Sequence, residues 1–145
     1  MSRRSLLFDA SSVFMLVRDL GGKALDLFRG GSTISLVYYE VGNALWRECF
    51  LLNRIDSKEA ADLLQSIFPI LRTMDVSHLE DEVLGDTVLS LAGKLNITYY
   101  DAAYLAEAQN SNKTLVTDDG KLVEAAEGAG VKTLTSKMLR QKLLH

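Results

Sequence analysis

Four acidic residues occupy positions from which their carboxylates could act together. Asp9 directly follows the apolar run "SLLF", and Asp119 lies just past the apolar run "TLV". Asp101 opens the segment "DAAYLA", and Glu40 lies in the helical pattern that follows "STIS". Convergent carboxylates repel one another, and a divalent cation offsets that repulsion. Because Mg²⁺ and Mn²⁺ prefer hard oxygen ligands, such a cluster is suited to one of these ions, at which a phosphate and an attacking water can be activated.

The same acids also have a purely structural interpretation. An aspartate at the start of a helix often caps the free backbone N–H groups or interacts with the helix dipole. The residue pattern alone leaves capping and metal binding both open.

The elements that must position these acids are short apolar strands that alternate with helices. Such alternation favours βαβ units, a mostly parallel and buried sheet, and ligand binding at the carboxyl ends of its strands. Asp56 is expected to cap the helix that follows it, and Pro69 to kink or end that helix. The expected strands are 5–8, 32–35, 114–116 and 131–134, and the expected helices cover about 36–53, 57–71, 79–95, 101–109 and 121–127.

The composition of the chain limits the class of protein to which it can belong. The chain has 145 residues, of which 48% are hydrophobic and 24% charged, and this balance predicts one globular domain spanning 1–145. The net charge of -3 gives no global basic field of the kind that many nucleic-acid-binding proteins carry. Cys49 is the only cysteine, and no apolar run approaches the roughly 20 residues of a membrane span. We therefore expect a cytoplasmic protein with no membrane partner.

Four segments, in order, resemble the successive motifs of PIN-domain proteins, and most closely those of the VapC-type toxin ribonucleases. The segments are "LLFDASSVFMLV", "SLVYYEVGNALWR", "ITYYDAAYLAEAQ" and "LVTDDGKL", and the resemblance covers essentially the whole chain. It implies an α/β fold: a PIN-like (Rossmann-like) α/β/α sandwich with a parallel sheet of four or five strands. It also implies a homodimer, an RNA substrate, Mg²⁺- or Mn²⁺-dependent endoribonuclease activity, and inhibition by a small cognate antitoxin.

The resemblance assigns roles to individual residues. The acidic catalytic and metal site falls on Asp9, Glu40, Asp101 and Asp119, and the accessory polar positions fall on Ser11, Asn43 and Thr117. Glu40, Asn43 and Arg47 are spaced to share one helix face.

Several of these side chains keep two interpretations. Arg47 could contact an RNA phosphate or form a salt bridge, and Lys121 is a second candidate for a phosphate contact. Ser11 could cap the following helix or contact the metal through water. Four tyrosines flank two of the acids, where they could pack in a core or dimer interface or stack on bases. They are Tyr38, Tyr39, Tyr99 and Tyr100.

Strand alternation predicts that the neighbouring residues Asp118 and Asp119 point in opposite directions. If the strand conformation continues past Val116, Thr117 and Asp119 face one way and Asp118 faces the other. The threonine–any–aspartate motif of the family selects the same pair. We therefore expect Asp119 at the site, and Asp118 as a solvated acid or as the cap of the next helix.

The expected reaction is hydrolysis of an RNA phosphodiester, in which a metal-activated water attacks the phosphate in line. Three alternatives remain: a PIN nuclease of RNA processing or decay without an antitoxin, a non-catalytic PIN-fold domain that binds RNA or protein, and a phospho-receiver domain. The Glu40 helix motif does not belong to the receiver pattern.

Overall fold

The computed structural model describes residues 2–143. Its centre is a five-stranded sheet in the order β3-β2-β1-β4-β5, with every neighbouring pair parallel. The strands are β1 Leu6–Phe8, β2 Ser32–Ile34, β3 Asp75–Ser77, β4 Thr114–Val116 and β5 Thr133–Leu134. The expected parallel α/β sheet is thus confirmed, at the upper end of the predicted strand number.

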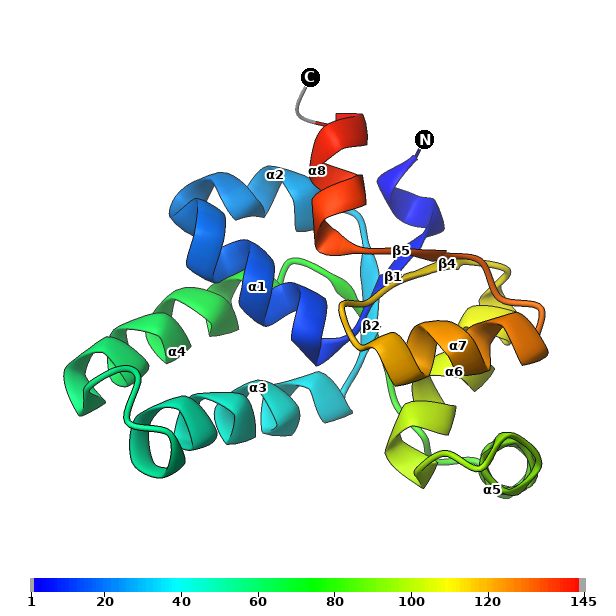
Figure 1. The fold of residues 1–145 in the computed structure, drawn as a ribbon. Helices are drawn as coiled ribbons and strands as arrows, with labels where there is room; N and C mark the ends of the chain where they lie inside the picture. The colour runs from blue at the N-terminus through cyan, green and yellow to red at the C-terminus, as the bar shows by residue number, and fades with distance from the viewer. Residues whose placement is uncertain (1, 144–145) are drawn as a thin grey trace.

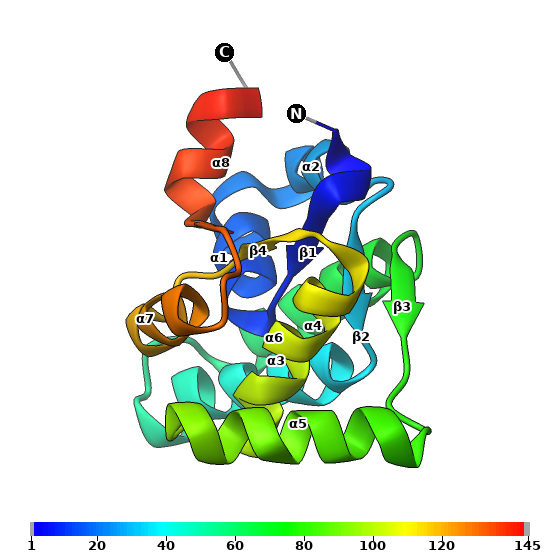
Figure 2. The ribbon, with the colours of Figure 1, turned by 90° about the vertical axis from the view of Figure 1, so that its right-hand side faces the viewer.

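Helices cover both faces of this sheet (Figures 1 and 2). On one face lie α1 Ala10–Leu20, α2 Leu25–Phe28, α3 Leu36–Trp46 and α4 Ser57–Leu71, with α8 Ser136–Leu143 beside them. On the other face lie α6 Tyr99–Ser111 and α7 Gly120–Gly128, and α5 Glu82–Leu95 packs on the outside of α6. Short 3-10 turns span Arg3–Ser5 and Gly21–Ala24.

Side-chain alternation in β1 explains the two cores. Leu6 and Phe8 pack with the helices of the first face, and Leu7 between them packs with α6 and α7. All three are fully buried, as expected for the central strand of a sheet that is covered on both sides. The Phe8 ring meets the Phe28 ring edge-on, with 4.7 Å between the centroids. A Cβ at Gly31 would lie 2.8 Å from the Phe8 ring and 3.0 Å from the Phe28 carbonyl oxygen, so this position favours glycine.

The order of the strands fixes where ligands can bind. From β1 the chain moves outward to β2 and β3, and it then returns to place β4 and β5 on the other side of β1. The carboxyl ends of β1 and β4 therefore form the switch point of the sheet, at which parallel α/β folds open a crevice. Asp9 follows β1, and the segment 117–119 follows β4.

Several expectations about the elements need correction. The strand β3 is not predicted from the sequence, because it is only three residues long and none of them is fully buried. Pro69 does not end its helix, which continues to Leu71. The helical pattern that begins at Leu36 changes at Arg47 into a π-helical turn, Arg47–Leu51. Asp56 caps α4 as expected, because its Oδ1 accepts a hydrogen bond of 2.8 Å from the N–H of Glu59.

Within residues 2–143, no helix is both long and apolar enough to cross a membrane.

Candidate active site

Asp9 is the most buried of the four candidate acids, with 4% of its surface exposed. It is the N-cap of α1, and its Oδ1 accepts hydrogen bonds from the Ser12 N–H at 2.9 Å and from the Ser11 hydroxyl at 2.8 Å. Its Oδ2 accepts a short hydrogen bond from the Thr117 hydroxyl, which reaches across from the end of β4. Burial raises the pKa of Asp9, and these hydrogen bonds, above all the one from Thr117, oppose the rise.

Glu40 is held by Tyr104, which lies outside the predicted set of site residues. The buried Tyr104 hydroxyl donates a hydrogen bond of 2.8 Å to Glu40 Oε1, joining α6 to α3. Burial raises the pKa of Glu40, and the negative charges of Asp9 and Asp101 raise it further. Burial, followed by the Glu40 carboxylate, also raises the pKa of Tyr104, which keeps its hydroxyl protonated and donating. A signal was present in the sequence, since Tyr104 lies three residues after Asp101 on the same helix face.

Asp101 and Asp119 are the other two candidate acids. Asp101 lies in the first turn of α6, where its N–H donates to the capping Thr98 hydroxyl at 3.1 Å. Burial raises the pKa of Asp101, the charge of Asp119 raises it further, and Lys121 opposes this rise. The four acids are thus linked by their charges. The charges of Asp9 and Asp101 act on the pKa of Glu40, and the charge of Asp119 acts on the pKa of Asp101. We define Asp9, Glu40, Asp101 and Asp119 as the acidic group.

The two aspartates of the doublet separate as strand alternation predicts, but their capping roles differ from the prediction. Asp119 is the N-cap of α7 and accepts from the Lys121 N–H at 3.0 Å, so the alternative in which Asp118 caps this helix is wrong. Asp118 turns instead toward α8, where its Oδ1 accepts from the Ser136 N–H at 2.9 Å. Its Oδ2 is buried and has no hydrogen-bond partner within residues 2–143, so the alternative of a fully solvated acid is also wrong.

Ser11 and Thr117 link the segments on either side of the switch point. Of the two interpretations of Ser11, the cap is wrong, because Asp9 caps α1. The Ser11 hydroxyl instead donates to Asp9 and accepts from the Asp118 N–H at 3.0 Å. The Thr117 hydroxyl accepts from the Asp119 N–H at 3.1 Å while it donates to Asp9. These two hydroxyls fix the loop after β4 against the start of α1.

An open groove of about 740 Å³ runs along α1 and α3 from the acidic group. Glu40, a member of the acidic group, and Asn43 line it. Its other charged lining residues are three arginines and two acids, namely Arg18, Arg47, Arg54, Glu48 and Asp118. Among residues 2–143, Arg54 pairs with Glu48 at 3.3 Å and Arg18 lies 3.8 Å from Asp19, whereas Arg47 forms no salt bridge. The salt-bridge interpretation of Arg47 is therefore not supported, and its exposed side chain faces the groove.

The donor set of the acidic group suits a hard divalent cation, because only oxygen ligands are present. As the side chains lie, however, no three acidic, histidine or cysteine residues among 2–143 are close enough to hold an ion together. Mg²⁺ tolerates this, since it keeps several of its waters and often takes only one or two carboxylates from the protein. The mutual repulsion within the acidic group further favours a bound cation.

Two proteins of Pyrobaculum aerophilum are similar to this chain in sequence. Exonuclease VapC9 is 37% identical over 109 residues, which cover 74% of this chain and 77% of that protein. Ribonuclease VapC3 is 36% identical over 92 residues, which cover 63% of this chain and 68% of that protein. No family model matches the chain.

Solved structures agree with the sequence relatives. The crystal structure of PAE2754 from Pyrobaculum aerophilum superposes with a TM-score of 0.75 at 32% identity, covering 97% of this chain and 96% of that one. A toxin–antitoxin complex from Klebsiella pneumoniae contains a chain with a TM-score of 0.61 at 16% identity, which shows a shared fold. On the identity and coverage of its sequence relatives, the chain belongs to the VapC family.

Proposed function

We propose that this protein is a Mg²⁺- or Mn²⁺-dependent endoribonuclease and the toxin of a toxin–antitoxin pair. The observation that carries the proposal is the acidic group at the carboxyl edge of a parallel sheet, in which neighbouring acids raise the pKa of Glu40 and of Asp101. The names of the relatives, a VapC exonuclease and a VapC ribonuclease, support a nuclease.

The chain supplies the site in three parts. Asp9, Glu40, Asp101 and Asp119 would hold the cation, which when bound supplies charge to the scissile phosphate and lowers the pKa of water. The hydroxyls of Ser11 and Thr117 fix the Asp9 carboxylate, and Tyr104 fixes Glu40. Such partners of metal ligands set ligand orientation and basicity. Asn43, on the Glu40 face of α3, provides a further polar contact at the groove.

The groove beside the acidic group is suited to the phosphates of RNA. A net charge of -3 gives no long-range attraction, so phosphate binding depends on local cations. Arg18, Arg47 and Arg54 line the groove, as do the acids Glu40, Glu48 and Asp118. Exposed Lys121 lies close enough to Asp101 to lower the pKa of that carboxyl. We assign the phosphate contacts to Arg47 first, because no salt bridge within residues 2–143 competes for it.

A cleavage assay tests the metal and the acids together. Labelled single-stranded RNA is incubated with wild type and with Asp9→Asn while Mg²⁺ and Mn²⁺ are titrated. We expect cation-dependent cleavage by the wild type and at least a hundredfold loss in the variant, roughly the effect of removing a group that stabilises the transition state. Equal cleavage by both proteins would refute the assignment of Asp9.

The same assay on a circular RNA separates internal from terminal cleavage. A circle has no ends, so only an endonuclease opens it. Linear product supports the proposal, whereas degradation of linear RNA with intact circles would make this protein an exonuclease, as VapC9 is named.

The partners follow from the family and are tested separately. A toxin–antitoxin complex is among the structural neighbours, and we infer a small cognate antitoxin for this chain as well as a homodimer. Co-expression with the short gene beside its own should yield a complex that does not cleave RNA, and sedimentation should give twice the chain mass. Full activity in the complex, or a monomer at micromolar concentration, would contradict these two inferences.

A further inference from the structure

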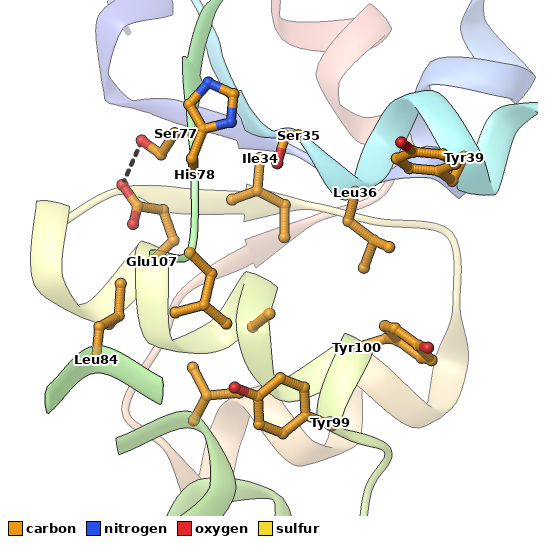
Figure 3. A pocket seen from close by; sticks show the side chains of 13 residues that line it. Ile34, Ser35, Leu36, Tyr39, Ser77, His78, Leu84, Tyr99, Tyr100 and Glu107 are labelled. Atoms are coloured by element: carbon orange, nitrogen blue, oxygen red, sulfur yellow. Dashed lines mark hydrogen bonds between the residues drawn. The ribbon is translucent and has the colours of Figure 1, made fainter. Parts of the chain in front are cut away.

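A second hollow shares no lining residue with the arginine-lined groove. It is a cavity of about 240 Å³ between α3, α5 and α6, at the carboxyl ends of β2 and β3 (Figure 3). Its mouth is next to the acids in sequence, because Tyr39 precedes Glu40 and Tyr100 precedes Asp101. We call it the tyrosine pocket.

The size and walls of the tyrosine pocket suit one flat ring system. Its sides are aliphatic, and Leu36, Leu84 and Val88 are among the lining residues. An engineered apolar cavity of about 150 Å³ accommodates benzene, and drug-sized ligands take about 300–1,000 Å³. A cavity of about 240 Å³ lies between these limits, which is the range of a nucleobase.

The tyrosines at this cavity are not core residues. Tyr39 is 79% exposed, Tyr100 60% and Tyr99 39%. Tyr38, by contrast, packs edge-on against Phe68 on the other face of the sheet. Exposed aromatic rings beside a phosphate-cleaving site are the surfaces on which unstacked RNA bases lie.

The end of the cavity away from Tyr39 and Tyr100 is polar (Figure 3). Glu107 Oε1 accepts hydrogen bonds of 3.0 Å from the hydroxyls of Ser77 and Ser111, which fix the carboxylate. Within residues 2–143, the structure gives Oε2 no hydrogen bond. A fixed carboxylate with a free oxygen accepts hydrogen bonds from an amino group, as Glu and Asp do from cytosine N4.

We propose that the tyrosine pocket binds one unstacked base of the RNA substrate, next to the cleaved phosphate, and that Glu107 selects a base with an exocyclic amino group over uracil. The proposal rests on the proposed function for its substrate. The strand would cross the acidic group with its phosphates on the arginine-lined groove and this base in the pocket. Tyr39 and Tyr100 flank the base at the mouth, and the Glu107 oxygen meets the amino group at the polar end.

The test is cleavage of a random-sequence single-stranded RNA pool, with sequencing of both products to read the bases around each cut. Wild type is compared with Glu107→Gln, which keeps an oxygen for Ser77 and Ser111 but replaces the free oxygen by an amide donor. Leu84→Trp fills the cavity, and Leu89→Trp is its matched control, because Leu89 lies on the same helix, 62% exposed and away from the cavity.

We expect uracil to be disfavoured by about tenfold at one fixed position beside the cut, as losing a hydrogen bond to a charged group predicts. Glu107→Gln should remove this bias, Leu84→Trp should remove all base preference there, and Leu89→Trp should match wild type. Identical base frequencies in all four proteins would overturn the proposal. So would a change in sedimenting mass with Leu84→Trp and unchanged base frequencies, because the cavity would then be a protein contact.

A measurement without catalysis keeps this proposal separate from the proposed function. Adenosine, cytidine and uridine monophosphates are titrated into the wild type and Leu84→Trp in the presence of a chelator. Binding of the first two that is lost in Leu84→Trp supports the base site even if no RNA is cleaved. Equal binding of all three, or none, overturns it even if RNA is cleaved.

Discussion

Thr117→Val is the sharpest test of how the site is held together. Valine has nearly the shape of threonine, but it lacks the buried hydroxyl that donates to Asp9 and accepts from the Asp119 N–H. The bond to a carboxylate contributes about 1.5–3 kcal/mol and the bond from the backbone about 1 kcal/mol. We expect a loss of about 3 kcal/mol in the free energy of unfolding, or roughly 9 °C in Tm for a chain of this size.

The pH dependence separates this effect from simple loss of packing. Because the Thr117 hydrogen bond opposes the burial that raises the pKa of Asp9, its removal raises that pKa further. If catalysis requires ionised Asp9, the acid limb of the pH–rate profile should move to higher pH. An acid with a raised folded-state pKa contributes stability that is present below its unfolded pKa and is lost as pH rises through the folded pKa. The variant should therefore lose more stability at neutral pH than at acid pH.

The assays are thermal unfolding at several pH values and RNA cleavage across the same range. Thr33→Val is the matched control, because Thr33 is equally buried and donates only to the neutral Phe8 carbonyl, at 2.8 Å. The control should lose about 1 kcal/mol and keep the acid limb in place. An acid limb that does not move in Thr117→Val, or moves equally in Thr33→Val, would refute the reasoning.

Three further predictions concern other contacts of the site and core. Asp119→Ala should abolish RNA cleavage, whereas Asp118→Ala should retain most of it. Asp118→Ala should also lower the unfolding free energy by about 1 kcal/mol, because the hydrogen bond from the first N–H of α8 is lost. The reverse ranking of the two variants in kcat/KM would contradict this prediction. Tyr104→Phe should lower kcat about tenfold and raise the pKa of Glu40, because the lost hydrogen bond lowers that pKa. The pH–rate profile measures this shift, and an unchanged profile would contradict the prediction. Gly31→Ala should destabilise the fold by about 1–3 kcal/mol in urea unfolding, since its Cβ meets an aromatic ring; unchanged stability would show that the ring can move.

The sequence predicted the sheet and the placement of the acids because both depend on local pattern. Apolar runs such as Leu6–Phe8 identify buried parallel strands, and residues that follow such strands gather at one edge. The strand Asp75–Ser77 lacks this pattern. A segment of three residues becomes a strand only through its hydrogen bonds to a neighbouring strand, here β2. That pairing is a tertiary contact, which the local sequence does not indicate.

The details of the site were less predictable, because they depend on which side chain reaches which backbone group. Ser11 and Asp9 are both good caps by type, and only the geometry shows that the Ser12 N–H bonds to Asp9. Asp118 was placed on the correct side of the chain by alternation. Its partner Ser136 lies 18 residues away, and no local pattern indicates that contact.

Two of the proposed metal-binding acids also begin helices, since Asp9 caps α1 and Asp119 caps α7. Asparagine caps a helix as well as aspartate does, and an aspartate codon becomes an asparagine codon by a single-base transition. The same transition turns the glutamate codon at Glu40 into lysine. Under the proposed function of a toxin nuclease, inactive but folded escape mutants should therefore accumulate as asparagine at positions 9 and 119, where one mutational step removes the charge and leaves the helix start intact.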